Sequence, residues 1–153
     1  TQALIQNKDP CQWILDCVNG EDTLELIDGL VCVSIVVTIP PYPHRQGGPD
    51  VDGKPIYGYD KKHVHLCDAR LGDNVPVPAG EGVVRIPSIV TAGEYVAVIC
   101  GTGKTISGAR RSALAATEKF MVKNKQYRNE IGSKMQKQLP DIQKHGYAQG
   151  LEP

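Results

Sequence analysis

One continuous stretch, residues 91–132, constrains most strongly how this chain can fold. Residues 95–100 form an apolar, largely β-branched run, which is typical of a buried strand. A glycine turn at residues 101–103 follows, and apolar residues then recur at helical spacing over residues 107–124. A strand, a tight turn and an amphipathic helix in this order form one packing unit. We therefore expect the rest of the chain to supply what packs against it.

A second helix is predicted near the start of the chain. Asp9 is a good N-cap and Pro10 suits the first helical position, while Asn19-Gly20 is a typical helix end. The helix is short, and residues 1–7 before it are expected to be the end of another helix. The apolar stripe of this helix is predicted at Trp13, Ile14, Cys17 and Val18.

The clearest strand lies at residues 30–39, which are almost continuously apolar. Such a run is typical of a central strand that is covered on both faces. Residues 21–27 alternate between polar and apolar and predict a partly exposed strand. Asp28-Gly29 between the two is a strong hairpin signal.

The remaining segments predict short strands separated by loops. Loops are expected at residues 44–54 and 68–80, and short strands at residues 54–59, at 62–67 and on either side of Pro87 within 82–90. A polar helix is expected at residues 133–139, where Pro140 interrupts it, and the residues after Gly146 are expected to be loose. The order of helix, strands and helix predicts a single α+β domain over residues 1–153, with mostly antiparallel strands.

Composition excludes several classes of partner. The formal net charge is zero and the chain has one Trp and one Phe, so neither a basic surface nor a base-stacking platform for nucleic acid is expected. No apolar run reaches the ~18 residues that a membrane span needs, so no membrane partner is expected. The five cysteines are irregularly spaced and form no C-x-x-C pair, which favours a reduced, cytoplasmic setting.

Gly103-Lys104-Thr105 lies between a predicted strand and a predicted helix, where a phosphate-binding P-loop would lie. A P-loop needs a glycine five positions before the second one, because successive backbone N–H groups must wrap a phosphate. That position holds Val98, in the middle of the strand. We therefore favour a turn followed by a helix cap at Thr105 or Ser107, and keep nucleotide binding as the weaker alternative.

Two other clusters contain residues with potential chemistry. His63, His65 and Cys67 share one face of a predicted strand and are zinc-ligand types, but a fourth ligand is not evident, so no metal is expected. Cys–His catalysis would need a proximity that sequence does not reveal. The helix predicted at residues 107–124 has a basic side, which either binds an anion at the helix N-terminus or simply faces solvent. Its residues are Lys104, Arg110, Arg111 and Lys119. These residues define no catalytic set, and the catalytic residues stay unknown.

Several short motifs occur in an order and spacing that resemble the C-terminal domain of phosphoribosylamine–glycine ligase, an ATP-grasp enzyme of purine biosynthesis. The most specific is Tyr127-Arg-Asn-Glu-Ile-Gly132, which is similar to the family's Y-R-x-D-I-G. The other matching pieces are Thr1-Gln2, residues 9–20, residues 31–37, Tyr42-Pro43, residues 53–56, residues 91–98 and residues 101–109.

The resemblance implies a barrel-sandwich hybrid fold and a role on the acceptor side of a carboxylate–amine ligase. In that family ATP and magnesium activate a carboxylate as an acyl phosphate, which an amine then attacks. The implied nucleotide- and magnesium-binding parts lie in ATP-grasp domains that precede this one or belong to another chain, so this chain alone is expected to bind neither and not to be catalytic. The implied contacts with a small-molecule substrate are Thr91, Ala92, Gly93 and Tyr95.

The sequence also departs from the family pattern. The family's G-G-R reads Gly93-Glu94-Tyr95, so Tyr95 stands where the arginine is expected. The histidine of the family's F-H-A-G-T is missing near residues 67–71, and Pro41 replaces the glycine before Tyr-Pro. These departures leave a second hypothesis open, namely a stand-alone, non-catalytic small-molecule or protein-binding module derived from that domain.

Overall fold

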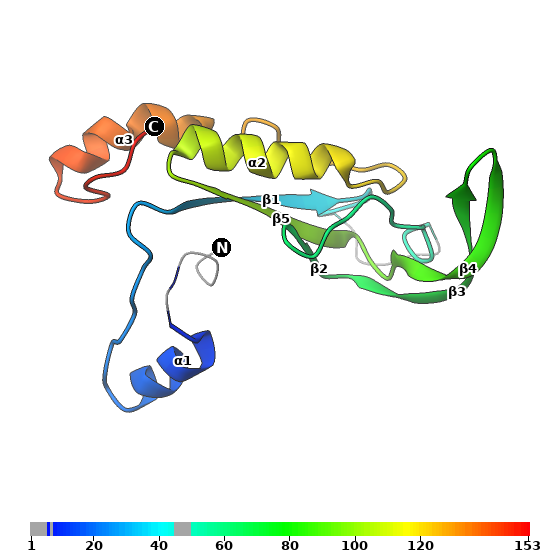
Figure 1. Cartoon of the computed structure of the whole chain (residues 1–153), viewed down its shortest axis with the longest axis horizontal. Helices are drawn as coiled ribbons and strands as arrows, with labels where there is room; N and C mark the ends of the chain where they lie inside the picture. Colours follow the sequence, from blue (N-terminus) through cyan, green and yellow to red (C-terminus); the bar gives the residue numbers. More distant parts are fainter. Residues whose placement is uncertain (1–5, 7, 45–49) are drawn as a thin grey trace. The chain divides into compact units, whose positions relative to one another are not determined.

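The computed structural model describes residue 6, residues 8–44 and residues 50–153. Its elements are α1 (Pro10–Val18), β1 (Val31–Thr38), β2 (Val64–Leu66), β3 (Ala69–Ala79), β4 (Gly82–Thr91), β5 (Tyr95–Gly103), α2 (Ile106–Lys119) and α3 (Ser133–Lys144) (Figure 1). The strands of the described residues form two open sheets, one in the order β1-β5-β2 and the other made of β3 and β4. The pairs β2–β5 and β3–β4 are antiparallel. The prediction of an α+β fold with mostly antiparallel strands is confirmed.

Some predicted features lie outside the described residues. These are most of the helix end expected at residues 1–7, the Thr1-Gln2 match, and residues 45–49 of the expected loop. Within the part of the chain that the structure describes, no helix is both long and apolar enough to cross a membrane.

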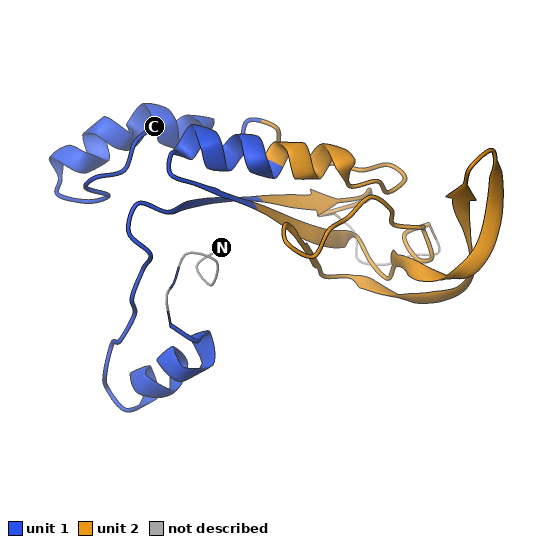
Figure 2. Cartoon of the chain, in the orientation of Figure 1, with its two compact units in different colours: residues 1–34, 101–113, 130–153 blue, residues 35–100, 114–129 orange. Residues whose placement is uncertain are grey.

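The chain divides into two compact units (Figure 2). The first comprises residues 1–34, 101–113 and 130–153, and the second comprises residues 35–100 and 114–129. Among the described residues, the first unit buries apolar side chains at Val33, Ile106, Ala109, Ala113 and Leu139. The second unit contains a continuous hydrophobic core, made by Val37, Ile39, Val51, Ile56, Val64, Val96, Ala97, Ile99, Ala116, Phe120 and Val122.

The central strand of the three-stranded sheet is β5, and β1 lies at the edge. The prediction that residues 30–39 form a central strand covered on both faces is therefore wrong. Burial alternates along β1, with Val33, Ile35 and Val37 buried while Val36 is 39% exposed. The prediction of a buried strand at residues 95–100 is confirmed. These residues belong to β5, which has a neighbouring strand on each side, and most of them are buried.

Gly101 and Gly103 are the last residues of β5 and not the predicted turn. A Cβ added at Gly101 would lie 2.2 Å from the backbone nitrogen of Ala113 and 2.5 Å from the carbonyl oxygen of Ala109. At Gly103 the added Cβ would lie 2.7 Å from the backbone nitrogen of Ala109. The two glycines thus let α2 pack directly on the backbone of β5.

The two ends of α2 are held by side chains. The backbone N–H of Gly108 donates to Thr105 Oγ1 at 3.0 Å, which confirms Thr105 as the N-cap. The helix ends at Lys119 and not at residue 124 as predicted. Lys125 Nζ donates to the carbonyl oxygens of Thr117 and Phe120, each at 2.7 Å, and so satisfies carbonyl groups of the last turn.

Residues 68–80 were predicted to be a loop, but most of this segment forms the long strand β3. It pairs with β4, which is one continuous strand and not two short ones separated by Pro87. The register shifts between Gly72 and Val75, and Pro87 lies opposite this irregularity. Because a proline lacks the N–H that a regular ladder needs, a two-stranded ribbon with a local bulge accommodates it readily.

Two other predicted strands are absent. Residues 21–27 form only one bridge, between Leu26 and Gln6, so Asp28-Gly29 makes a turn but no hairpin. Residues 54–59 likewise form isolated bridges and no strand.

The C-terminal part is more ordered than predicted. Helix α3 continues through Pro140, because the burial of Leu139, which is 1% exposed, offsets the hydrogen bond that the proline removes. The residues after Gly146 are fastened and not loose. Gln143 Nε2 donates to the carbonyl oxygen of Leu151 at 2.9 Å. The N–H of Ile106 donates to the carbonyl oxygen of Glu152 at 3.1 Å.

Candidate functional site

A cleft of about 570 Å³ adjoins the turn that the sequence resemblance implies for substrate binding. Its lining residues all belong to the second unit and are Pro40, Pro41, Asp50, Asp52, Lys54, Lys123 and Asn124. The cleft combines two carboxylates, two ammonium groups and two rigid proline rings. Such a lining suits a polar ligand more than an apolar one.

Thr91 fastens one wall of this cleft. Its side chain is fully buried, and its Oγ1 donates to the carbonyl oxygen of Val51 at 2.5 Å and accepts from the N–H of Lys54 at 3.0 Å. The Thr91 backbone adds two hydrogen bonds, each of 2.9 Å. Its N–H donates to the carbonyl oxygen of Lys54, and its carbonyl oxygen accepts from the N–H of Gly53. The hydroxyl of Thr91 thus holds the segment that carries Lys54, and Lys54 is the group that reaches the cleft.

Ala92 and Gly93 form a tight turn against Asp68. Ala92 is an exposed residue, and its N–H donates to the carbonyl oxygen of Asp68 at 2.8 Å. A Cβ added at Gly93 would lie 2.5 Å from Asp68 Oδ2, and the same oxygen accepts from the N–H of Tyr95 at 3.1 Å. This contact requires glycine at position 93 while the carboxylate stays bound to the turn.

Tyr95 lies beside Tyr42, with ring centroids 6.0 Å apart and the rings tilted by 56°. Burial raises the pKa of Tyr95, with smaller contributions from Cys67 and Tyr42. The phenol is therefore neutral near pH 7 and does not replace the charge of the arginine that the resemblance predicts at this position. Burial also raises the pKa of the Cys67 thiol, which disfavours a thiolate nucleophile.

The charges around the cleft have different partners. Arg70 binds Asp52 through two hydrogen bonds, from Nε at 3.1 Å and from Nη2 at 2.9 Å. This side-chain hydrogen bonding holds the pKa of Asp52 below its usual value, so Asp52 stays an anion. Lys54 and Lys123 supply the positive charge of the lining. The arrangement can orient a ligand that carries a negative group, but it offers no nucleophile paired with a base.

The His63, His65 and Cys67 cluster does not form a metal site in the structure described. Nowhere among the described residues do three His, Cys, Asp or Glu side chains lie close enough to hold a metal ion. The Nδ1 atom of His63 lies 3.0 Å from Asp60 Oδ1, and hydrogen bonding from His63 lowers the pKa of Asp60. His63 thus has a local carboxylate partner on the turn before β2.

Two backbone N–H groups in the first turn of α2 already have hydrogen-bond acceptors within the chain. Thr105 Oγ1 accepts one first-turn N–H, and the carbonyl oxygen of Glu152 accepts that of Ile106. A phosphate cradle needs such donors to point at the ligand. The geometry at Lys104 and Thr105 therefore favours a capped helix over a nucleotide site. Arg110, from the predicted basic side, donates from Nε to the carbonyl oxygen of Ile131 at 2.9 Å, which is a structural contact.

The sequence reasoning located the turn but missed the two lysines of the cleft. Lys54 lies within the matched segment at residues 53–56, so its motif was visible although its role was not. Lys123 follows the end of α2, and the sequence around it gives no comparable signal. Comparison with known proteins assigns no family to this geometry, because no family model matches the chain and no curated protein matches it either.

Proposed function

We propose that this chain is the C-terminal domain of an ATP-dependent carboxylate–amine ligase that resembles phosphoribosylamine–glycine ligase of purine biosynthesis. In this proposal the domain has the barrel-sandwich hybrid architecture of that family and works in the cytoplasm. It completes the acceptor-substrate side of an active site whose other side belongs to ATP-grasp domains.

One observation carries the proposal. The turn of Thr91, Ala92 and Gly93, which the ordered motifs nominate for substrate contact, is hydrogen-bonded to the wall of a polar cleft through Thr91 and Lys54. A turn that merely closed a loop would not need to hold a charged cleft residue in place. The pairing of motif and cleft supports a binding role for this face of the second unit.

The chain's own residues would bind and orient the acceptor. Lys54 and Lys123 would attract a negative group, and the exposed carboxylate of Asp50 would face a cationic amine. In this proposal ATP and magnesium would be bound by the ATP-grasp domains, where ATP activates the carboxylate. Tyr42 and Tyr95 would add an apolar wall near the turn.

A titration with ribose 5-phosphate, a stable compound that carries the sugar phosphate of the family's acceptor, tests the binding role. We expect ¹⁵N chemical-shift changes at Lys54, Ala92 and Lys123. Replacing both lysines by alanine should weaken binding about tenfold or more, since it removes about 1.4 kcal/mol or more of binding free energy. The matched control is Lys61→Ala, which removes an exposed lysine outside the cleft. Equal weakening by the control, or shifts elsewhere only, would contradict the proposed site.

The ligase assignment has its own test. The native, untagged protein should be isolated from its source, and its intact mass and co-purifying chains determined. A polypeptide much larger than 16.6 kDa that contains an ATP-grasp portion, or a tightly bound ATP-grasp subunit, is the expected result. The preparation should then release ADP only when a carboxylate and an amine are both present.

The second candidate function is a stand-alone, non-catalytic binding module. It is favoured by the residues that follow Gly93, because Glu94 is only 7% exposed and Tyr95 is uncharged where the resemblance predicts an arginine. A lone native species of 16.6 kDa that still binds ribose 5-phosphate would support this candidate against the ligase.

A further inference from the structure

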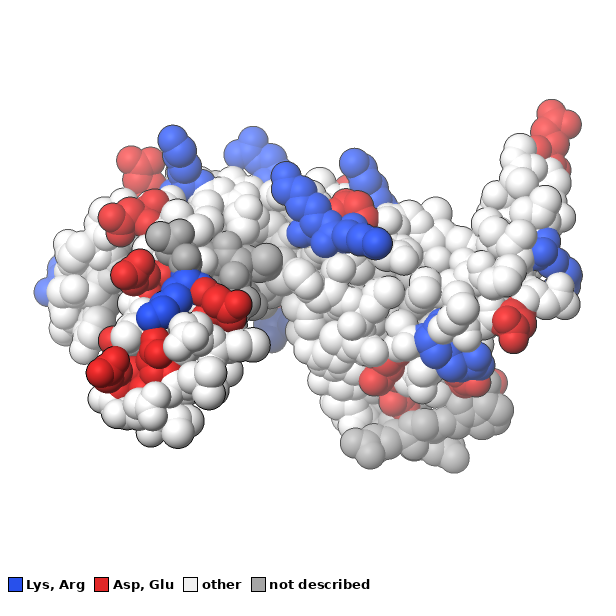
Figure 3. All heavy atoms as spheres, turned by 60° about the horizontal axis from the view of Figure 1, so that its bottom comes forward, with Lys and Arg blue, Asp and Glu red and all other residues white. Residues whose placement is uncertain are grey.

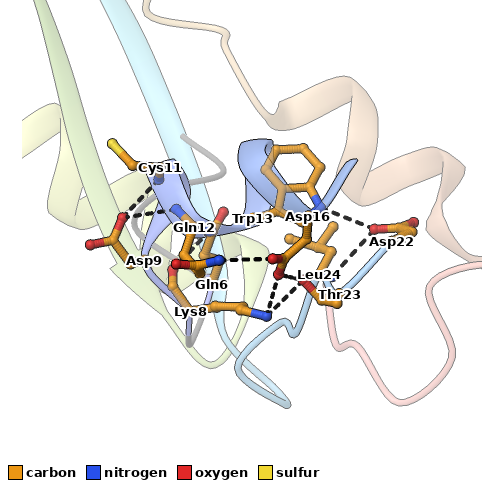
Figure 4. Close-up of polar contacts among 10 residues, drawn as sticks. All are labelled: Gln6, Lys8, Asp9, Cys11, Gln12, Trp13, Asp16, Asp22, Thr23 and Leu24. Carbon is orange, nitrogen blue, oxygen red and sulfur yellow. Dashed lines mark hydrogen bonds and ion pairs between the residues drawn. The ribbon is translucent and has the colours of Figure 1, made fainter. Parts of the chain in front are cut away.

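The N-terminal segment, residues 8–30, is held in shape by polar contacts of its own (Figure 4). Lys8 Nζ lies 2.6 Å from Asp16 Oδ2 and donates to Thr23 Oγ1 at 2.7 Å, and the Thr23 hydroxyl donates to the same carboxylate. Trp13 Nε1 donates to Asp22 Oδ1 at 3.0 Å. These contacts tie one face of α1 to the chain on either side of it, and none of them involves Ile14, Leu15 or Val18.

Those apolar side chains are exposed instead. Ile14, Leu15 and Val18 recur on the face of α1 opposite Asp16, and their exposed fractions are 56%, 57% and 79%. No residue of α1 is buried, although the sequence predicts an apolar stripe there. Leu26 and Ile27 extend the exposed set, at 53% and 41%. An exposed apolar stripe along a helix whose other face is held by polar contacts is a candidate protein-binding face.

The charge of the segment narrows the choice of partner. Its acidic residues are Asp9, Asp16, Glu21, Asp22, Glu25 and Asp28, and its single cation is Lys8. Figure 3 shows acidic side chains gathered on the surface of this segment. An apolar face with an acidic border is complementary to an apolar face with a basic border.

The same chain carries such a surface at α3. The cations of this helix are Lys134, Lys137 and Lys144, of which Lys144 is paired with the single acid, Asp141. Exposed apolar side chains also belong to this part of the chain, Met135 within α3 at 37% and Tyr147 just after it at 70%. The chain thus presents two exposed surfaces of opposite charge, each with an apolar part.

We propose that the N-terminal segment docks on α3 of a second copy of this chain, in a reciprocal dimer. The stripe of Ile14, Leu15 and Val18 covers Met135 and Tyr147 of the other copy, while the acidic border faces Lys134 and Lys137. Reciprocity gives two identical contacts related by a two-fold axis, so the assembly closes at two copies. This dimer is independent of any ligase activity.

The first test is the mass of the purified chain in solution, measured by light scattering and sedimentation over a range of concentrations. We expect a species of twice the 16.6 kDa chain mass. Leu15→Glu together with Val18→Glu should return the chain to a monomer with an unchanged circular dichroism spectrum. The matched control, Val83→Glu, alters a side chain that is 67% exposed on β4 and should leave the dimer intact. A monomer at every concentration, or equal disruption by the control, overturns the proposal.

A charge exchange tests which surfaces meet. One variant carries Glu21→Lys and Glu25→Lys, and the other carries Lys134→Glu and Lys137→Glu. Each alone opposes like charges at both contacts and should be monomeric, whereas an equimolar mixture matches opposite charges at both and should dimerise. Raising the salt concentration from about 0.05 M to about 0.5 M should weaken the wild-type dimer, because it screens these charges. Failure of the mixture to dimerise, or dimerisation of each reversed variant alone, would show that other surfaces form the contact.

Discussion

Replacing Gly101 by alanine tests the packing on which the first unit depends. The added methyl group would meet the backbone of α2 at two points, 2.2 Å from Ala113 N and 2.5 Å from Ala109 O. Ordinary contacts of a Cβ atom begin at 3.4 Å. Both obstructing atoms belong to a helix backbone, so no rotation of a side chain relieves the overlap. The helix must move by about 1 Å, which separates a whole close-packed face.

The expected cost follows from that displacement. Overpacking of a core costs about 1–3 kcal/mol, and we expect about 3 kcal/mol here because the collision is with backbone. Ala109 and Ala113, both 0% exposed, lose contact with β5 when the helix moves. At about 2–4 °C per kcal/mol for a chain of this size, the midpoint of thermal unfolding should fall by about 10 °C.

Urea and thermal unfolding followed by far-ultraviolet circular dichroism measure this effect. Gly82→Ala is the matched control, since Gly82 also lies in a strand and its added Cβ would meet nothing closer than 3.8 Å. The control should be neutral or slightly stabilising, by about 0.5 kcal/mol, because alanine restricts the unfolded chain. If the free energy of unfolding of Gly101→Ala lies within about 0.5 kcal/mol of the wild-type value, the close approach of α2 to β5 is not as described.

Three other substitutions have defined outcomes. Thr91→Val keeps the side-chain shape but leaves a buried carbonyl and an N–H unpaired, so urea unfolding should show a loss of about 1–3 kcal/mol, while an unchanged midpoint would contradict its fastening role. Lys125→Met removes the ammonium that caps α2, and should cost about 1–2 kcal/mol by the same assay, whereas exposed Lys123→Met should cost almost nothing. Hydrogen bonding from Lys8, and to a smaller extent from Thr23 and Gln12, lowers the pKa of Asp16 from 3.8 to about 2. The ionised Asp16 carboxylate therefore stabilises the folded state fully above pH 3.8, and this contribution is lost as the pH falls through about 2. The free energy of unfolding, measured by urea titration at a series of acid pH values, should lose this contribution in the wild type but not in Asp16→Asn.

The sequence motifs nominate a turn beside the candidate cleft, but they do not indicate the cleft's charged lining. The turn at residues 91–93 was predicted from ordered motifs, but its hydroxyl proved to be buried and bonded to Val51 and Lys54. The cleft depends on residues that are distant in sequence, such as Pro40 and Lys123. No local pattern marks such a group, because its members come together only when the chain folds.

The sequence by itself determined the features that depend on neighbouring residues. Asp9 and Pro10 start α1 as predicted, since an N-cap and a fixed φ angle act within one turn of helix. Thr105 caps α2 for the same reason, and the apolar run at residues 95–100 forms a strand.

Only the tertiary structure decided which strand is central and why the glycines are needed. β1 has as apolar a sequence as β5, yet it lies at the sheet edge, because strand order depends on which distant segments pair. Gly101 and Gly103 looked like a turn, but they continue β5 where the backbone of α2 comes too close for a Cβ. Caps and periodicity are local properties of a chain, whereas burial, strand order and close approach are properties of segments that meet only in the folded state.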